Sequence, residues 1–150
     1  MTQTGGRYPG WRPGIELRDD WLGLVPETAI DPQREIVDPH HHLWRHGTPD
    51  APAVYEMDAL WRDTGAGHNV VQTVYIECRS YWDRDAPAHL QSVGETRTVA
   101  QMAAQVPRGQ AQIAGIIAQT ELVLPPDQLH AALDAHEAAG NGLFKGIRNS

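Results

Sequence analysis

Four short runs of apolar residues alternate along the chain with longer stretches whose apolar residues recur at helical spacing. The runs are rich in β-branched residues and are bounded by polar, glycine or proline positions, a pattern that predicts β-strands. The predicted strands cover residues 36–38, 70–78, 112–122 and 142–148.

The segments between these strands predict three helices. Between the second and third strands one apolar face is formed by Val99, Met102, Ala103 and Val106, and Ser92 with Glu95 predicts a capping box at the helix start. Between the third and fourth strands the helical face is followed by Gly140 and preceded by two prolines; it consists of Leu129, Ala132, Leu133 and His136. A weaker face between the first two strands consists of Val54, Met57 and Trp61.

Strand and helix alternate at a spacing of roughly 30 to 40 residues, which is typical of βαβ units and a parallel sheet. The predicted fold class is therefore α/β, with about four β/α units that would make the first half of a TIM-type (β/α)8 barrel. Because Ser150 directly follows the fourth strand, we expect a truncated gene product or fragment. A small open sheet, complete as it stands, is the alternative. Half a barrel has two unpaired strand edges, which predicts self-association.

The first 34 residues differ in composition from the rest and are rich in glycine, proline and tryptophan. They predict an irregular N-terminal arm over residues 1–34, followed by the partial barrel over residues 35–150. Because exposed tryptophan is costly, Trp11 and Trp21 are expected to dock on the folded body. A flexible leader is the alternative.

Composition and charge narrow the class of protein. The hydrophobic fraction of 41% and the charged fraction of 21% are those of a folded globular chain. A net charge of -7 disfavours nucleic acid as a partner. Cys78 is the only cysteine, and the N-terminus lacks the layout of a signal peptide, so a cytoplasmic location is expected. No apolar run reaches the roughly 20 residues that a membrane span needs.

Three consecutive histidines follow the apolar run of the first predicted strand. Because successive side chains of a strand point to opposite faces, His40 and His42 share a face and His41 points away. Two imidazole nitrogens on one tetrahedral zinc ion lie about 3.3 Å apart, which two inward-leaning side chains can reach. Asp38, on the same face, could orient the pair. The alternative is a pair of histidines that only bond to backbone carbonyls or solvent.

The segment Asp38-Pro39-His40-His41-His42-Leu43-Trp44 resembles the Asp-x-His-x-His-(Leu/Phe)-Trp segment that opens the barrel in the amidohydrolase-related branch of the amidohydrolase superfamily. Further matches follow in order along the chain: Gly67-His68-Asn69-Val70, Val74 to Cys78, Val93-Gly94-Glu95-Thr96 and Lys145-Gly146-Ile147-Arg148. The resemblance covers about residues 35 to 150. It implies a (β/α)8 hydrolase in which His40 and His42 bind a divalent metal ion, zinc or manganese, or in some lactonases bind substrate without a metal.

Three further residues are candidates for binding a small-molecule substrate. Arg148, at the end of the fourth strand, has a guanidinium suited to a carboxylate or carbonyl oxygen. Glu77 ends the second strand and could orient a ligand or accept a hydroxyl, or could simply pair with Arg79 or Arg148. Tyr81 follows in the loop and could line the pocket. Asn149 occupies the position at which relatives often carry a histidine, whose role is therefore in doubt here.

The resemblance implies hydrolysis of a lactone or similar cyclic ester, in which a metal or cationic side chain polarises the carbonyl and a carboxylate activates water. The aspartate that transfers protons in relatives would lie beyond Ser150, so no catalytic base is assigned. A metal-dependent decarboxylase of a carboxylic acid and a non-catalytic fragment are the alternatives. Cys78 is expected to be a packing residue, and Glu121 a strand-end carboxylate that could face the site. His68, His89, His130 and His136 are expected to be solvated or to lie on helix faces.

Overall fold

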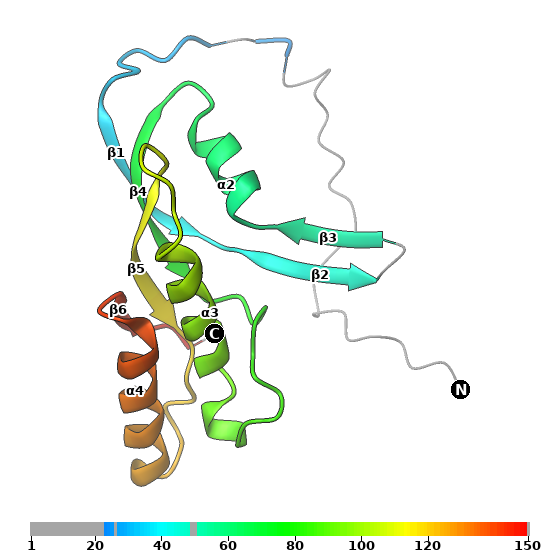
Figure 1. Cartoon of the computed structure of the whole chain (residues 1–150), viewed down its shortest axis with the longest axis vertical. Coiled ribbons are helices and arrows are strands. Elements are labelled where there is room, and N and C mark those ends of the chain that lie inside the picture. The colour runs from blue at the N-terminus through cyan, green and yellow to red at the C-terminus, as the bar shows by residue number, and fades with distance from the viewer. Residues whose placement is uncertain (1–22, 26, 49–50, 150) are drawn as a thin grey trace.

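The computed structural model describes residues 23–25, 27–48 and 51–149, and it has a mixed α/β architecture (Figure 1). Four strands form a parallel sheet in the order β1 (Glu35–His41), β4 (Asn69–Ile76), β5 (Gln112–Ala118) and β6 (Phe144–Ile147). The predicted α/β class is confirmed, and each predicted strand is present. The third strand ends at Ala118 rather than at residue 122. Glu121 therefore does not end a strand; it is exposed in the following loop.

Helices α3 (Val93–Ala103) and α4 (Pro126–Gly140) pack side by side on one face of this sheet (Figure 1). Register pairs place Tyr75, Ile116 and Phe144 in one row across β4, β5 and β6. The Tyr75 hydroxyl bonds to Glu95 of α3, and the Phe144 ring stacks on His136 of α4. Because paired residues point to the same side of a sheet, this row is the helix-covered face.

The core lies between the helices and that row of strand residues. Its fully buried members come from β4, β5, α2 (Met57–Thr64), α3 and the segment after β1, and they include Leu43, Leu60, Tyr75, Val99 and Ile116. Burying an aliphatic or aromatic side chain of this size contributes roughly 1.5–3 kcal/mol. The core therefore fixes β1, β4 and β5 relative to α2 and α3.

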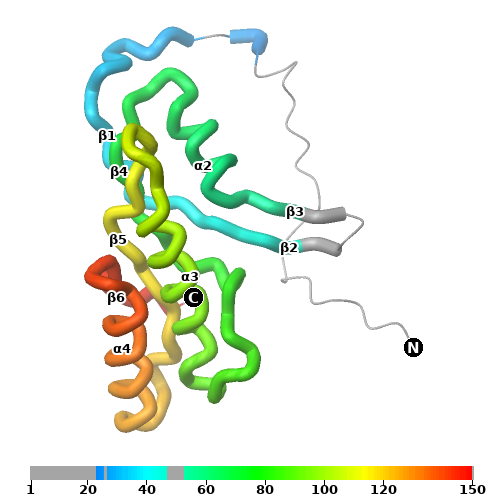
Figure 2. Tube along the Cα trace, in the orientation of Figure 1, coloured from blue at the N-terminus to red at the C-terminus, as the bar shows by residue number. Residues whose placement is uncertain are grey.

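An antiparallel hairpin that the sequence pattern did not predict follows β1. It consists of β2 (Trp44–Thr48) and β3 (Ala51–Tyr55), and Figure 2 traces it away from the parallel sheet. At its base the rings of Trp44 and Tyr55 stack with centroids 4.8 Å apart. The helix expected between the first two strands is present as α2 and contains Met57 and Trp61, but Val54 belongs to the hairpin, so its place on that helical face is wrong. The buried residue of α2 is Leu60.

The helix ends agree only in part with the sequence signals. Helix α4 begins at Pro126 and ends at Gly140, where Asn141 adopts the left-handed conformation with φ of 47°. The capping box predicted for Ser92 and Glu95 is wrong, because neither side chain caps α3. The Ser92 hydroxyl lies 3.3 Å from Nε2 of His136, and the Glu95 carboxylate bonds to the loop that follows β4.

The predicted N-terminal arm falls mostly on residues outside the described part of the chain, which includes Trp11 and Trp21. Within the described part of the arm, Leu24, Val25 and Ile30 are exposed. Among the described residues, no helix is both long enough and apolar enough to cross a membrane.

Candidate functional site

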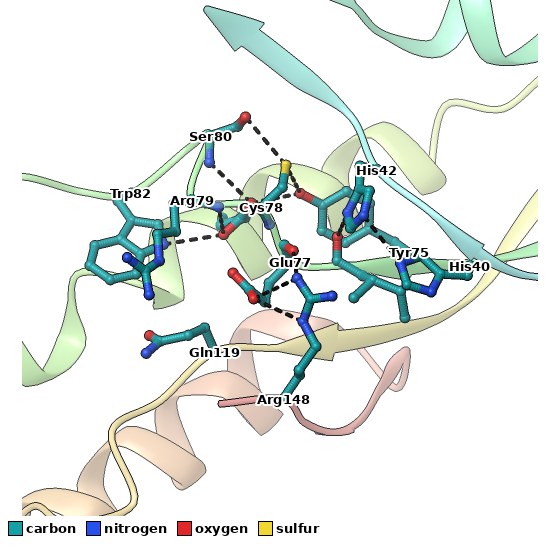
Figure 3. Close-up of polar contacts among 12 residues, drawn as sticks. His40, His42, Tyr75, Glu77, Cys78, Arg79, Ser80, Trp82, Gln119 and Arg148 are labelled. Atoms are coloured by element: carbon teal, nitrogen blue, oxygen red, sulfur yellow. Dashed lines mark hydrogen bonds and ion pairs between the residues drawn. The ribbon is translucent and has the colours of Figure 1, made fainter. Parts of the chain in front are cut away.

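The histidine pair lies at the carboxyl end of β1, on the face of the sheet opposite α3 and α4. His41 pairs with Tyr75 in the strand register and packs against its ring, with centroids 5.6 Å apart, so it belongs to the helix-covered face. The side chains of His40 and His42 point the other way, and their Nε2 atoms lie 3.1 Å apart (Figure 3). This separation is close to that of two nitrogen ligands on one zinc ion.

The tautomer of His42 follows from its second nitrogen. Nδ1–H of His42 donates to the carbonyl of Ile76, the last residue of β4, at 2.8 Å. Nε2 of His42 therefore carries a lone pair, and Nε2–H of His40 donates to it. A backbone carbonyl that fixes the outer nitrogen of an imidazole is the usual support of a ligating histidine. The sequence analysis missed this contact, because it depends on the pairing of β1 with β4.

Asp38 does not contact either imidazole ring. Its carboxylate accepts the backbone N–H of His40 at 3.0 Å, across Pro39, which has no N–H of its own. The strand register between β1 and β4 shifts between Asp38 and His41. Asp38 thus stabilises the irregular backbone that carries the histidine pair, while Ile76 orients a ring.

Glu77 and Arg148 meet at the same edge, at the carboxyl ends of β4 and β6 (Figure 3). Nε and Nη2 of Arg148 donate to Oε1 of Glu77 at 3.1 and 2.9 Å, and Nη2 also donates to the Glu77 carbonyl at 2.8 Å. Glu77 is only 2% exposed, and its second carboxylate oxygen has no hydrogen-bond partner among the described residues. The structure therefore pairs Glu77 with Arg148, which the sequence analysis had left open.

A cavity of about 350 Å³ opens beside the histidine pair. Residues from both faces of the sheet at the end of β1, from the base of the β2–β3 hairpin and from α2 line this cavity. The lining residues are Asp38, His40, His41, His42, Trp44, Tyr55, Leu60, Asp63, Thr64 and Val70. The volume suits a small molecule. Among the described residues two carboxylates contribute to the wall and no lysine or arginine does, so the cavity favours a neutral or hydroxyl-rich ligand over an anion.

Tyr81, Cys78 and Asn149 form their hydrogen bonds with groups other than the histidine pair. The Tyr81 hydroxyl donates to Oε1 of Glu56 at 3.0 Å, which turns it toward the hairpin base. The Cys78 thiol donates to the Leu43 carbonyl at 3.1 Å, and burial raises its pKa. Asn149 donates from Nδ2 to the Thr120 carbonyl at 3.2 Å and so joins the chain segments that follow β6 and β5.

Two further histidines are buried, and burial lowers the pKa of each. The pKa of His41 falls to about 4. His136, which was expected to be solvated or on a helix face, faces the core and is fully buried. Its Nε2–H donates to the Gln119 carbonyl at 3.1 Å, and the Thr96 hydroxyl donates to its Nδ1 at 2.8 Å. The neutral ring thus satisfies both nitrogens and ties α4 to α3 and to the end of β5.

Among the described residues, no three histidine, cysteine or carboxylate side chains converge in a way that could hold a metal ion. The histidine pair can supply two of the ligands that a metal ion needs. Comparison of the chain with protein-family models, with curated proteins and with solved structures finds no match.

Proposed function

We propose that the chain is part of an amidohydrolase-related hydrolase that opens a lactone or similar cyclic ester. The observation that carries the proposal is the pair of Nε2 atoms 3.1 Å apart at the carboxyl end of a parallel strand, with a small-molecule cavity beside it. In barrel enzymes the carboxyl ends of the strands build the active site. The resemblance of residues 38–44 to the segment that opens the amidohydrolase-related barrel supports the same reading.

The sheet topology supports the proposal that these strands are half of a (β/α)8 barrel. Neighbours in the sheet follow chain order, β1-β4-β5-β6, with every pairing parallel. A doubly wound sheet reverses its strand order at a switch point and carries helices on both faces, whereas a barrel does neither. Helices α3 and α4 lie on one face, and His40 and His42 lie on the other, which would be the barrel interior.

The roles of the residues follow from their contacts. His40 and His42 would hold a divalent metal ion, zinc or manganese, through Nε2, with His42 fixed by the Ile76 carbonyl. The bound ion supplies Lewis acidity toward the ester carbonyl. Arg148, held by Glu77, offers its remaining nitrogen to a carbonyl or carboxylate oxygen. The resemblance implies that the proton acceptor is an aspartate of the eighth strand, so no residue of this chain is assigned that role.

A metal-dependent decarboxylase is the second candidate, and Arg148 is the observation that favours it. Two of its three guanidinium nitrogens bond to Glu77, and Nη1 has no partner among the described residues, so it is available to a carboxylate. The cavity beside the histidines points to the first candidate, because its wall contains Asp38 and Asp63 but, among the described residues, no lysine or arginine. A neutral lactone avoids the repulsion that a carboxylate would meet there.

The test compares the two reactions in the purified chain loaded with zinc or manganese. Hydrolysis of a neutral sugar δ-lactone is followed by acid release, and decarboxylation of an aromatic carboxylic acid by carbon dioxide release. The variant with both His40→Ala and His42→Ala gives the background rate in the absence of the histidine pair. His130→Ala, at an exposed position on α4, is the matched control. We expect slow lactone turnover, because this chain contributes no assigned proton acceptor, and we expect only the double variant to lose it. Carbon dioxide release without lactone opening would favour the decarboxylase. Neither reaction in a metal-loaded chain would identify a non-catalytic fragment.

A further inference from the structure

Glu95, in the first turn of α3, is a buried carboxylate surrounded by hydrogen-bond donors. It is 2% exposed. Its Oε1 atom accepts the Tyr75 hydroxyl at 2.6 Å and the backbone N–H groups of Cys78 and Ser80 at 3.0 and 3.2 Å. Its Oε2 atom accepts the backbone N–H of Arg79 and the indole N–H of Trp82, each at 3.2 Å. Five donors thus replace the water that this carboxylate loses on burial.

The backbone of the segment after β4 is shaped around this carboxylate. Three consecutive N–H groups, those of residues 78 to 80, converge on it, and the middle residue, Arg79, has a φ of 63° in the left-handed region. Successive N–H groups with such a conformation form a concave anion-binding nest. Here the anion is a side chain of the protein itself. The strained backbone at Arg79 is offset by the bonds to Glu95.

The far end of the same loop rests directly on α3. A Cβ atom at Gly94 would lie 2.7 Å from the Tyr81 carbonyl oxygen and 2.6 Å from the Asp83 nitrogen, so only glycine admits this approach. The loop of residues 78–82 is therefore held by hydrogen bonds to Glu95, and its end packs directly against Gly94.

The near end of the loop carries two groups of the candidate site. The Ile76 carbonyl accepts Nδ1–H of His42, and the Glu77 carboxylate accepts two donors of Arg148. Cys78, the first residue whose N–H bonds to Glu95, follows Glu77 immediately. Figure 3 shows Cys78 next to Glu77, and Glu77 facing Arg148. A displacement of the loop would therefore move Ile76 and Glu77, and with them the support of His42 and Arg148.

We propose that Glu95 is a positioning residue of the site: by occupying the backbone nest of residues 78–80 it holds Ile76 and Glu77 where they orient His42 and Arg148. The role in catalysis rests on the proposed function, whereas the nest and its effect on Arg148 do not. An empty nest should rebind a small carboxylate, because the donors belong to the backbone and remain after the side chain is removed. This property separates the proposal from a role of Glu95 in stability alone.

The experiment removes the Glu95 carboxylate by mutation and then supplies a free carboxylate in solution. Glu95→Ala is titrated with formate, and three signals are followed: amide hydrogen exchange at residues 78–80, the NMR resonance of Arg148 Nε–H, and lactone turnover. We expect faster exchange, a shifted Arg148 resonance and kcat lower by roughly tenfold to a hundredfold, the size of effect expected for a small misplacement of site groups. Formate should reverse all three changes in the variant and alter none in the wild-type protein. Glu137→Gln, an exposed carboxylate of α4, is the matched control.

Glu95→Gln covers the case in which the alanine variant does not fold. The glutamine amide would keep one acceptor oxygen but would point its NH₂ at the N–H groups of Arg79 and Trp82, and it would leave no room for formate. We expect an altered Arg148 resonance that formate does not restore. An unchanged Arg148 resonance in the variants, or an alanine variant that formate does not restore, would overturn the proposal. If the wild-type chain opens no lactone, the proposed function fails, and the exchange and NMR signals still decide the role of Glu95.

Discussion

The Nε2 atoms of His40 and His42 lie 3.1 Å apart because a shift in strand register and the Ile76 carbonyl together aim both rings at one point. The direct hydrogen bond between the rings requires a proton on Nε2 of His40. A metal ion bound by both rings would take the place of that proton, which would move to Nδ1. The pair thus has the geometry of two metal ligands while remaining hydrogen-bonded in the absence of a metal.

This geometry predicts that metal binding depends on both histidines. The His40→Ala, His42→Ala variant should lose bound zinc or manganese, and each single variant should bind at least about tenfold more weakly, since even a change in the groups around a ligand costs 10- to 100-fold. Metal content after dialysis, measured by elemental analysis, checks this. His68→Ala, at an exposed loop position, should bind as the wild type does. Equal metal content in the double variant would refute the site.

The ion pair of Glu77 and Arg148 should affect stability through the buried carboxylate. Arg148→Ala leaves Glu77 buried without its donors and should lower the free energy of unfolding by roughly 2–3 kcal/mol. Glu77→Gln removes the charge and should lessen the effect of losing Arg148. A double-mutant cycle in urea denaturation should therefore give a coupling energy of about 1–2 kcal/mol. Strictly additive effects would show that the pair contributes nothing specific.

His136 should make stability depend on pH. Its pKa in the folded chain is lowered from the ordinary value of 6.5, so the unfolded chain binds the proton more readily. The contribution of the neutral His136 ring to the free energy of unfolding is then fully present above about pH 6.5. It is lost as the pH falls below this value, by at most about 1.4 kcal/mol per pH unit for one proton. Protonation would place a hydrogen on Nδ1, where the Thr96 hydroxyl now donates.

Urea denaturation at several pH values between 7.5 and 5 measures this effect. His136→Gln should unfold more easily at every pH, because it loses the packing against Phe144, but its stability should change less with pH than that of the wild type. His130→Gln, six residues earlier on the exposed side of α4, should retain the wild-type slope. An unchanged slope in His136→Gln would show that His136 is not the source and would leave His41, whose pKa is about 4, as the buried histidine that causes it.

The parallel sheet should promote association through its two free edges, β1 and β6 in the described part of the chain, and a substitution on β1 tests one of them. Within the described part of the chain β1 has one neighbour, β4, and Val37 on β1 is 52% exposed. Unpaired edges template strand addition, and a lysine on an edge strand opposes it. We expect oligomers by light scattering and a shift toward monomer in Val37→Lys. Val123→Lys, at a 91% exposed position outside the sheet, is the control. A monomer at all concentrations would contradict the prediction.

The sequence predicted those features that depend on residues close together in the chain. The alternation of side chains in a strand places His40 and His42 opposite His41, and the prolines and glycine around residues 126–140 mark helix α4. These patterns repeat over two or four residues, so local geometry determines them. The α/β class and the parallel strands followed from the same patterns.

The remaining features depend on partners far along the chain. Arg148 and Glu77 are 71 residues apart, so the sequence offered their pairing only as one of several alternatives. His42 is oriented by a backbone carbonyl, which has no sequence signature. Glu95 was read as a capping residue because it lies three positions after Ser92, but the convergence of N–H groups from another segment outweighs the local cap. The hairpin was missed because residues 44–55 lack a run of alternating apolar and polar positions.

The nest around Glu95 also bears on how this loop can diverge in evolution. Three of its five donors are main-chain groups, which every amino acid except proline provides. These three donors therefore remain whichever residue other than proline occupies positions 78–80, although the Cys78 thiol also bonds to the Leu43 carbonyl, and glycine and asparagine are best suited to the left-handed position of Arg79. As long as the acidic residue on α3 is retained, substitutions in this loop could present different side chains at the surface while the histidine pair keeps its position.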